Sequence, residues 1–385
     1  MVSPSGIAFE GTAGGRAPIA AARTRRYGAP MRAVVVGGGI VGTACALALA
    51  RRGAGVELRE AAPALGLGAS GTNSGILHTG FDSVPGELET ELILRAAVLR
   101  PPVLAALGVP FAATGAVLTP RDDAERETVA TLAQGAARNG VTVVIGDDGR
   151  LEVPGEGLTD PVAFVLALGA AAQRHGARIA TGTAVTGRVA DADLVVNAAG
   201  LGAGRVARLH GDDSFDVHPR KGEFLVFDVT PPPQILLPVP TKRTKGVLVF
   251  GTLDGRTIAG PTAVDLDEED WSVRPEARGE LLGQAVSLYP ALDGAEPVFA
   301  YAGLRPAGRG GANYVVRRSE ADPALVHAAA IRSTGLTAAL AIAERVAALA
   351  GADGPEAELR GGPGGWGRVP AGPWYRRAAE HRALG

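Results

Sequence analysis

The segment from Ala33 to Glu60 limits the possible folds of this chain more than any other part of the sequence. An uncharged run leads into Gly37-Gly38-Gly39, a helical stretch follows, and a second short apolar run ends at an acid. This order is typical of a strand, a glycine turn, a helix and a second strand that ends in a carboxylate. Gly37 permits the tight turn, and Gly42 lets the helix pack close to the strand. The pattern predicts a dinucleotide site.

Each part of this segment has its own expected role toward the dinucleotide. Gly39 lets backbone N–H groups approach a pyrophosphate, whose negative charge is favoured by the positive end of the helix. Glu60, 18 residues after Gly42, is placed to accept hydrogen bonds from an adenosine ribose. The expected contacts with the dinucleotide come from Gly37, Gly39, Ile40, Val41, Gly42 and Glu60.

The same segment resembles a membrane span, because the 18 residues from Ala33 to Ala50 carry no charge. A parallel strand buried on both faces, followed by a helix packed on its sheet, produces the same run. Three consecutive glycines would also be a poor choice for a lipid-facing helix. The preceding Thr24-Arg25-Arg26 hints at a twin-arginine export signal, but the fold already explains the apolar stretch behind it. We therefore predict no membrane span.

Composition excludes several classes of protein. The chain has 385 residues, enough for two or three domains, and its net charge of −2 argues against a nucleic-acid-binding protein. Cys45 is the only cysteine, so we expect no disulfide framework, no metal site and no iron–sulfur cluster. Residues 1–30 lack apolar periodicity and a signal-peptide core, which predicts a disordered leader or an upstream start. A cytoplasmic location is the simplest interpretation.

Lysine is rare and concentrated in one region. Of the 38 basic residues only Lys221, Lys242 and Lys245 are lysines, and arginine is used elsewhere. Lysine and arginine are not interchangeable where a compact ammonium of adjustable pKa is needed. A solvated hairpin explains Lys242. Lys245 comes directly before the apolar strand predicted over 246–250, and this strand would carry it inward.

Helices and strands are predicted to alternate along the rest of the chain, with a strand-rich middle. Helices are expected over residues 85–108, with a break at Pro101-Pro102, and over 122–139, 160–175, 276–288 and 336–349. Strands are expected over 111–118, 141–145, 192–200 with its final glycine turn, 298–302, 314–317 and 325–330. An antiparallel sheet is expected over 215–261, and a loop-rich tail from Gly351 onward.

Four further segments carry distinctive motifs. They are Thr72–Gly80, which contains an N-S-G-x-x-H turn, His218–Phe224, Val239–Val249, and the pair Ala302–Pro306 with Ile331–Thr337. In order and spacing, these segments resemble the flavoproteins of the D-amino-acid-oxidase superfamily, in particular the glycerol-3-phosphate dehydrogenase/oxidase branch. The L-2-hydroxyglutarate dehydrogenase/oxidase group is a close relative that shares the N-S-G-x-x-H turn. The resemblance covers residues 32 to about 350.

The resemblance implies an α/β fold with a discontinuous Rossmann-like FAD-binding domain of the GR2 type and an inserted substrate domain with a mixed or antiparallel sheet. The FAD-binding domain would be formed by residues 31–83, 158–212 and 297–352. The substrate domain would be formed by residues 84–157 and 213–296, and residues 353–385 would be a loop-rich tail.

The resemblance also favours FAD over a nicotinamide cofactor, because the late turns fit the way this family closes around FAD. Gly335, Leu336 and Thr337 open the last helix, whose N–H groups would stabilise negative charge at the pyrimidine edge of reduced flavin. FAD is expected to be held without a covalent bond, since Cys45 lies on the wrong element for attachment. Further contacts with FAD are implied for Thr72, Asn73, Ser74, Gly75, Ala199, Gly200 and Gly303.

A base is needed to oxidise a secondary alcohol, because the hydroxyl proton must leave while hydride passes from carbon to flavin N5. His78 is the candidate, since it follows the turn Gly75-Ile76-Leu77 and the family places the matching histidine beside the flavin. Lys245 matches a lysine near the flavin, which either assists the reaction with oxygen or holds substrate. His218 is expected to be structural.

Fixed cations are needed to hold an anionic substrate. The resemblance brings Arg305, in a Gly-Leu-Arg-Pro turn, and Arg332 over the flavin. A guanidinium fork matches the oxygens of phosphate or carboxylate well. Ser333 would add a hydroxyl donor.

We therefore predict FAD-dependent oxidation of a small anionic secondary alcohol, with glycerol 3-phosphate, oxidised to dihydroxyacetone phosphate, as the first candidate. L-2-hydroxyglutarate or a related 2-hydroxy acid is the alternative, followed by an amine or amino acid and by a flavin-binding subunit without catalysis. The short end after the last helix and the lack of cysteine motifs predict that the C-terminal domain and iron–sulfur appendage of larger relatives are missing. The sequence does not decide whether the electron acceptor is oxygen, a quinone or another molecule.

Overall fold

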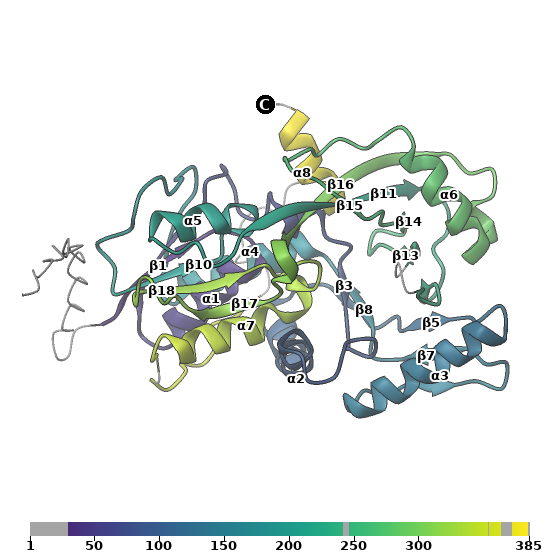
Figure 1. Cartoon of the computed structure of the whole chain (residues 1–385), viewed down its shortest axis with the longest axis horizontal. Coiled ribbons are helices and arrows are strands. Elements are labelled where there is room, and N and C mark those ends of the chain that lie inside the picture. The colour runs from purple at the N-terminus through teal and green to yellow at the C-terminus, as the bar shows by residue number, and fades with distance from the viewer. Residues whose placement is uncertain (1–29, 242–245, 353, 363–371, 384–385) are drawn as a thin grey trace, which may run out of the picture.

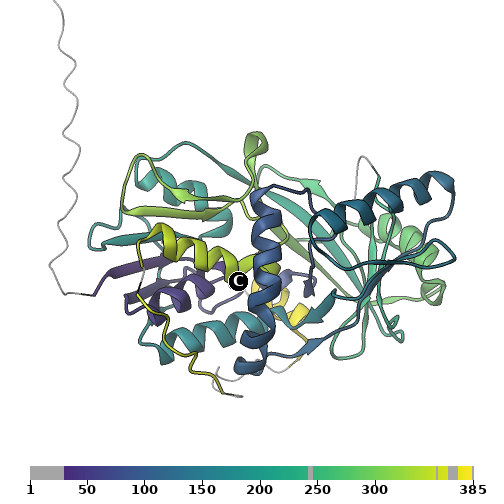
Figure 2. The same cartoon turned by 90° about the horizontal axis from the view of Figure 1, so that it is seen from below.

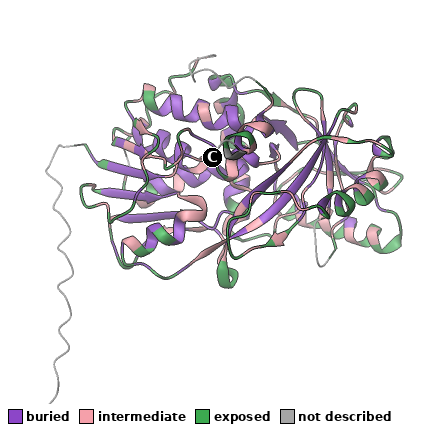
Figure 3. Ribbon diagram, turned by 90° about the horizontal axis from the view of Figure 1, so that it is seen from above, coloured by how far each residue is buried: buried purple, intermediate pink, exposed green. Residues whose placement is uncertain are grey.

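Two large sheets dominate the fold. The computed structural model describes residues 30–241, 246–352, 354–362 and 372–383. The sheets lie at opposite ends of the molecule, and the long helix α2 (Leu88–Leu107) runs between them (Figure 1, Figure 2). Their strands are mostly buried, whereas exposed residues gather on the outer helices and loops (Figure 3). The molecule is thus a mixed α/β fold with more than one sheet.

The six-stranded sheet is the parallel part that the sequence predicts. Its order is β17-β18-β10-β1-β2-β9, and all neighbours are parallel except β17 and β18. Helices cover its central strands, so β1 is buried from Ala33 to Val36. The strands are β1 Arg32–Val36, β2 Gly55–Arg59, β9 Arg178–Ala180, β10 Leu194–Asn197, β17 Val315–Arg318 and β18 Leu325–Ala329.

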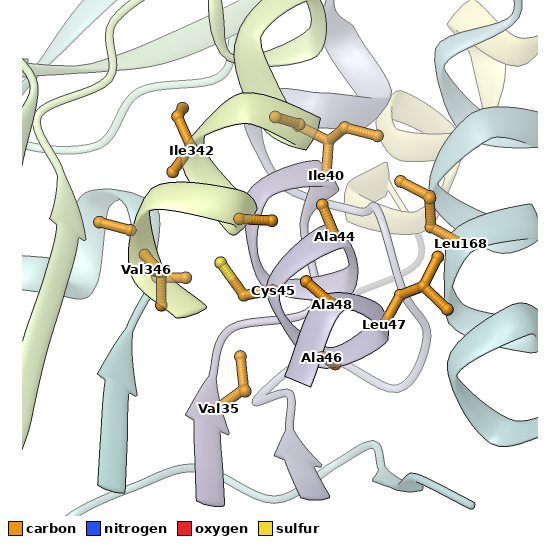
Figure 4. Packing of buried hydrophobic residues seen from close by; sticks show 14 of the residues in the cluster. Val35, Ile40, Ala44, Cys45, Ala46, Leu47, Ala48, Leu168, Ile342 and Val346 are labelled. Carbon is orange, nitrogen blue, oxygen red and sulfur yellow. The ribbon is translucent and has the colours of Figure 1, made fainter. Parts of the chain in front are cut away.

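Helix packing beside this sheet forms the main core. α1 (Ile40–Arg51) packs against α4 (Pro161–Arg174) and α7 (Gly335–Leu349), and α2 packs against α7. Small and aliphatic side chains let α1 lie close to its neighbours, and Cys45 points toward Ile342 and Val346 of α7 (Figure 4). Burial raises the pKa of Cys45 to about 12. This cysteine is a packing residue. A shorter helix, α5 (Ala203–Leu209), follows β10.

The nine-stranded sheet is mainly antiparallel, and β12 and β5 are a parallel pair in it. Its longest ribbon pairs β11 (Val217–Phe227) with β16 (Pro297–Gly308), and this pairing sets Arg220 opposite Arg305. α3 (Asp123–Arg138) and α6 (Ala277–Leu288) lie at the outer end of this part (Figure 1). The other strands are β5 Ala116–Leu118, β6 Val144–Ile145, β7 Leu151–Val153, β12 Ile235–Leu237, β13 Leu248–Gly251, β14 Thr257–Gly260 and β15 Val264–Asp265.

A small third sheet lies between the two large ones. It contains β3 (Ile76–Leu77), β8 (Gly157–Thr159) and β4 (Phe111–Ala112), with β3 antiparallel to β8. Leu77 faces Gly157 in this register, so the next residue on each side brings position 78 close to position 156. The 3₁₀ turns are η1 Ala69–Thr72, η2 Gly200–Gly202, η3 Pro290–Leu292 and η4 Arg309–Gly311.

Helix α2 contradicts the predicted break at Pro101-Pro102, because it continues through both prolines. A proline in a helix removes an N–H donor and usually kinks or ends the helix. Both proline residues are exposed, whereas the face that carries Ile93 and Leu104 is buried in the core. Packing of that face keeps the helix continuous despite the missing donors.

One further prediction about secondary structure is wrong. Residues 111–118 form β4 and β5 instead of one strand, because Gly115 turns the chain with a φ of +67°. The described part of the tail after α7 is largely irregular, and it also contains one helix, α8 (Trp374–Ala383). Its first two aromatic rings pack on Tyr301, with ring centroids 5.9 Å away for Trp374 and 6.2 Å away for Tyr375.

The predicted domain boundaries stay a prediction. The sheets show, however, that residues 297–352 do not all lie with the six-stranded sheet. Residues 297–352 were expected to belong to the FAD-binding part, and β17, β18 and α7 do lie with the six-stranded sheet. β16, however, hydrogen-bonds along β11 and therefore lies in the nine-stranded sheet. The chain crosses from one sheet to the other after β16.

Among the described helices, none combines the length and the apolar character that crossing a bilayer requires. The uncharged run from Ala33 to Ala50 is divided between β1, the glycine turn and α1.

The α1–α7 contact yields the first prediction. Ile342→Ala removes a fully buried side chain between these helices and should lower the free energy of unfolding by about 2 to 5 kcal/mol. Chemical denaturation measures this change. Val98→Ala, at an exposed position on α2, is the matched control and should change stability by less than about 0.5 kcal/mol. Equal effects of both substitutions would contradict the packing described.

Candidate active site

The turn between β1 and α1 makes the close contacts that its glycines predict. Gly37 has a φ of +109°, and a Cβ on it would lie 2.3 Å from the Ala198 carbonyl oxygen. A Cβ on Gly42 would lie 1.8 Å from the carbonyl oxygen of Gly37. Glycine is therefore required at both positions to bring α1 onto β1 and to bring the end of β10 alongside.

Glu60 follows β2 and faces this turn. Its Oε2 accepts a hydrogen bond from the N–H of Gly38 at 2.5 Å, and its Oε1 accepts one from Ala62 at 2.7 Å. The N–H of Ile40 donates to Ser70 Oγ at 2.9 Å, so η1 touches the start of α1. Each carboxylate oxygen has a second lone pair, which suits a ribose hydroxyl.

The turn that follows η1 lies against the start of α7. Asn73 Oδ1 accepts from the N–H of Gly75 at 2.9 Å, and Asn73 Nδ2 donates to the Ser333 carbonyl oxygen at 3.3 Å. The N–H of His78 donates to Thr337 Oγ1 at 3.0 Å. Residues separated by about 260 positions in the chain therefore meet here, as the resemblance implies.

Helices α1 and α7 begin close together and point two N-termini at this region. A Cβ on Gly335 would lie 3.8 Å from the Val41 side chain. Neither N-cap, Gly39 or Thr334, makes a side-chain hydrogen bond into its helix, and neither helix has an acidic residue in its first turn. Such helix starts attract anions. They fit the pyrophosphate of FAD at α1 and the negative edge of reduced flavin at α7.

The other predicted cofactor residues lie around the same two turns. The N–H of Ala199 donates to Asn197 Oδ1 at 3.4 Å, and Gly200 follows with a φ of +57°. A Cβ on Gly303 would lie 2.8 Å from Thr72 Oγ1, so β16 touches η1 at this point. Two remaining ones are Ser74, whose Oγ accepts from the N–H of Ile76 at 3.4 Å, and Leu336, which is buried in the first turn of α7.

A cavity of about 900 Å³ lies next to this cradle. The turn after η1, the β11–β16 ribbon and the loop before α7 all contribute to its wall. The predicted base and the described residues predicted to bind substrate line one common cavity, namely His78, Arg305, Arg332 and Ser333.

His78 is tied to three other parts of the chain. Its Nδ1 lies 3.0 Å from Oε2 of Glu156, whose side chain is fully buried. Arg100 of α2 donates to the carbonyl oxygens of His78 at 2.9 Å and of Thr337 at 2.8 Å. Burial lowers the pKa of Arg100 to about 10, and the negative charge of Glu156 opposes this shift. Backbone and ring of His78 are thus both held.

Sequence reasoning missed Glu156 and Arg100. Glu156 stands between two glycines directly before the short apolar strand β8, and this is the only signal that the sequence carries. Arg100 is one of many arginines, and its role depends on α2 continuing through the following prolines. Neither position belongs to a motif with a defined spacing.

Arg305 lies inside strand β16 and not in the predicted turn. The Gly-Leu-Arg-Pro sequence stays extended because β11 pairs along it. The guanidinium donates to the carbonyl oxygens of Lys221 at 3.4 Å and Thr262 at 3.2 Å. A Cβ on Gly222 would lie 2.2 Å from Nη2, so the guanidinium lies across this glycine. Burial, assisted by the charge of Arg220, lowers the pKa of Arg305 to about 10.

Arg332 has a protein carboxylate as its partner. It has a left-handed φ of +53° and forms an ion pair with Glu89 of α2. Glu89 also accepts from Thr334 Oγ1 at 2.7 Å and from Asn313 Nδ2 at 3.0 Å. The loop before α7 is therefore fastened to α2 through this acid.

Of the three lysines, Lys221 lies among the residues that the structure describes. Lys221 is fully buried, and its Nζ donates to Asp270 Oδ2 at 2.5 Å and to the Ser272 carbonyl oxygen at 2.9 Å. Lys242 and Lys245 lie outside the described residues, so the role expected for Lys245 stays a prediction. The buried lysine is explained by its ion pair.

The close contact at Gly42 yields a prediction about cofactor retention. Gly42→Ala would force α1 away from Gly37, so the purified protein should lose most of its visible flavin absorption. Gly135→Ala is the matched control, because a Cβ there meets nothing within 4 Å in helix α3. The control should keep its flavin and gain up to about 1 kcal/mol of stability. Full flavin content in Gly42→Ala would contradict the predicted cradle.

The sequence of this chain matches a known protein family and several characterised relatives. A family model described as FAD dependent oxidoreductase (DAO) matches residues 32–349. The glycerol 3-phosphate oxidase of Mycoplasma pneumoniae is 28% identical over 357 residues, which cover 80% of this chain and 91% of that protein. The mitochondrial L-2-hydroxyglutarate dehydrogenase of Arabidopsis thaliana is 26% identical, with 90% of this chain and 87% of that protein covered.

A solved structure extends the similarity to three dimensions. The dithionite-reduced L-α-glycerophosphate oxidase from Mycoplasma pneumoniae, solved with FAD bound, has a TM-score of 0.80 and 25% identity. The match covers 87% of this chain and 99% of that one. Because the family model spans most of the sequence, the chain belongs to the DAO family of FAD-dependent oxidoreductases, and FAD is its cofactor.

Proposed function

We propose that this enzyme oxidises a small anionic secondary alcohol, with glycerol 3-phosphate, converted to dihydroxyacetone phosphate, as the first candidate. One observation carries the proposal: a histidine and a partly buried arginine, His78 and Arg305, line the same cavity. The similarity to a glycerol 3-phosphate oxidase over 91% of that protein's length supports this choice of substrate.

FAD would be held by both helix starts and by the turns that surround them. When bound, FAD supplies the acceptor for hydride from the substrate carbon. Glu60 would accept from the adenosine ribose, as it already does from the backbone N–H groups of Gly38 and Ala62. The residues proposed to contact FAD are Gly37, Gly39, Ile40, Val41, Gly42, Glu60, Thr72, Asn73, Ser74, Gly75, Ala199, Gly200, Gly303, Gly335, Leu336 and Thr337.

His78 would take the proton of the substrate hydroxyl. A base must lie within hydrogen-bond reach of that hydroxyl, and the side chain of His78 is on the cavity wall with 29% of its surface exposed. Arg100 donates to the His78 carbonyl oxygen, and the His78 N–H donates to Thr337 Oγ1, so the backbone that carries the ring is fixed. Holding the base in place keeps the reaction fast, because even a small displacement of a catalytic group lowers the rate.

Arg305 would bind the anionic group of the substrate. Its two hydrogen bonds go to carbonyl oxygens, which orient the guanidinium without neutralising its charge. A phosphate or carboxylate from the substrate would supply that negative charge. Arg332 and Ser333 would act at the rim of the cavity, with Arg332 shared with Glu89. Lys245 remains a candidate for the reaction with oxygen or for holding substrate.

A 2-hydroxy acid such as L-2-hydroxyglutarate is the second candidate. The similarity to an L-2-hydroxyglutarate dehydrogenase over 87% of that protein favours it. Such a substrate would need a second cation, and Arg220, which pairs with Asp265 at 3.1 Å, also lines the cavity. We propose a cytoplasmic enzyme. The electron acceptor could be oxygen, a quinone or another molecule.

Anaerobic reduction tests the proposed substrate directly. The purified FAD-loaded enzyme is mixed with glycerol 3-phosphate, L-2-hydroxyglutarate or amino acids, and the visible flavin band is followed. Glycerol 3-phosphate should bleach the band fastest, and air with a peroxide assay then separates an oxidase from a dehydrogenase. Reduction by L-2-hydroxyglutarate alone would replace the first candidate, and no reduction by any of them would overturn the proposal.

His78→Ala tests the base. Substrate-driven bleaching should slow by about 10² to 10⁴-fold, because proton removal in the transition state is lost. FAD content, read from the spectrum of the purified variant, should stay unchanged. An unaltered bleaching rate would remove His78 from the chemistry.

Gly222→Ala tests the placement of Arg305. A Cβ at this position would displace the guanidinium that lies across it, so KM for the anionic substrate should rise about tenfold or more. FAD content is measured in the same preparation, because Gly222 pairs with Gly303, a proposed FAD contact, and the rise in KM must be read on FAD-loaded enzyme. Gly279→Ala on α6, where a Cβ meets nothing within 4 Å, is the control. A normal KM in Gly222→Ala would contradict the proposed anion site.

A further inference from the structure

A buried acid stands behind the proposed base. The register of β3 and β8 brings Glu156 next to His78, and the Glu156 side chain has no exposed surface. Its Oε2 lies 3.0 Å from His78 Nδ1. A buried carboxylate in direct contact with a histidine that lines a cavity needs a reason, because burial of a charge is costly unless it is paired.

The two oxygens of Glu156 have different partners. Oε1 accepts from the N–H of Thr79 at 2.7 Å and from its Oγ1 hydroxyl at 2.9 Å. The hydroxyl donates to Glu156 because a carboxylate only accepts, and Thr79 Oγ1 in turn accepts from the N–H of Phe81 at 3.3 Å. Thr79 thus fixes the rotation of the carboxylate and turns Oε2 toward His78. A carboxylate only accepts, so His78 Nδ1 must carry the hydrogen.

We propose that Glu156 is a positioning residue that holds His78 with its proton on Nδ1, so that Nε2 is the nitrogen that takes the substrate proton. The inference rests on the proposed role of His78 as base. In the oxidation, the hydroxyl O–H bond breaks and its proton goes to Nε2, while the C–H hydrogen leaves with two electrons as hydride to FAD. The alcohol becomes a ketone, and the imidazolium remains beside the Glu156 carboxylate.

The surrounding charges suit this arrangement. Arg100 of α2 directs its guanidinium at the carbonyl oxygens of His78 and Thr337, so its charge acts on Glu156 without a direct hydrogen bond between them. The imidazolium formed during the reaction would give Glu156 a contacting cation. Among the described residues that line the cavity, Asp82, Glu89 and Arg332 also carry charge.

Glu156→Gln separates this role from simple packing. Thr79 presents two donors, so the amide oxygen must take the place of Oε1 and the amide NH₂ must face His78. The NH₂ would donate to Nδ1 and leave the hydrogen on Nε2, which can then no longer accept the substrate proton. The substitution keeps the size and shape of the side chain but moves the hydrogen of the neutral His78 ring from Nδ1 to Nε2.

Three measurements test the proposal on the FAD-loaded enzyme. In Glu156→Gln, kcat should fall about 10²-fold or more while KM and FAD content change little. The acidic limb of its pH–rate profile should move to lower pH, because the negative charge beside the ring is gone. Glu152→Gln on β7, at a half-buried position four residues earlier, is the control and should behave like the wild type. Wild-type kcat in Glu156→Gln would overturn the proposal.

The tautomer can be read without turnover. Nitrogen-15 NMR of the histidine-labelled wild-type enzyme, with His78 identified by its loss in His78→Gln, should show hydrogen on Nδ1 of the neutral ring. Hydrogen on Nε2 would overturn the proposal, even if Glu156→Gln fails to fold. This measurement needs no substrate, so the positioning role can hold or fail independently of glycerol 3-phosphate oxidation.

Discussion

The approach of α1 to β1 at Gly37 and Gly42 is the contact on which the rest of the molecule depends. A single Cβ at Gly42 would lie 1.8 Å from the Gly37 carbonyl oxygen, so there is no room for any other residue. Because α1 lies this close, α7 and α4 can pack on it, and α7 begins beside Val41. The pyrophosphate end and the flavin end of the proposed cradle are therefore set by one helix contact, although their residues are far apart in sequence.

The proposed base is positioned by elements that no short segment contains. His78 follows β3, and its ring faces an acid that precedes β8. Its carbonyl oxygen is held by α2, and its N–H by α7. Each contact is a hydrogen bond with a modest net value, but together they fix both the backbone and the ring. A large part of the fold is thereby used to orient one imidazole.

The sequence predicted well what depends on local geometry. The glycine turn, the helix predicted over 160–175 and the helix start at Gly335 each follow from residue types at fixed spacing. Predictions failed where a distant partner decides the conformation. The Arg305 segment is extended because β11 pairs with it, and α2 passes two prolines because its other face is buried. Glu156 was missed for the same reason, since two-residue strands such as β3 leave no periodic pattern.

Charge pairing explains why the two predicted anion-binding arginines differ. Arg332 already has the Glu89 carboxylate, which also fastens the loop before α7, so a substrate anion would have to compete with this ion pair. Arg305 is oriented by two carbonyl oxygens that carry no net charge, and burial lowers its pKa to about 10. A bound anion would oppose that shift and stabilise the guanidinium. The larger gain in free energy from an anionic substrate is therefore expected at Arg305, on the wall of the cavity that His78 also lines.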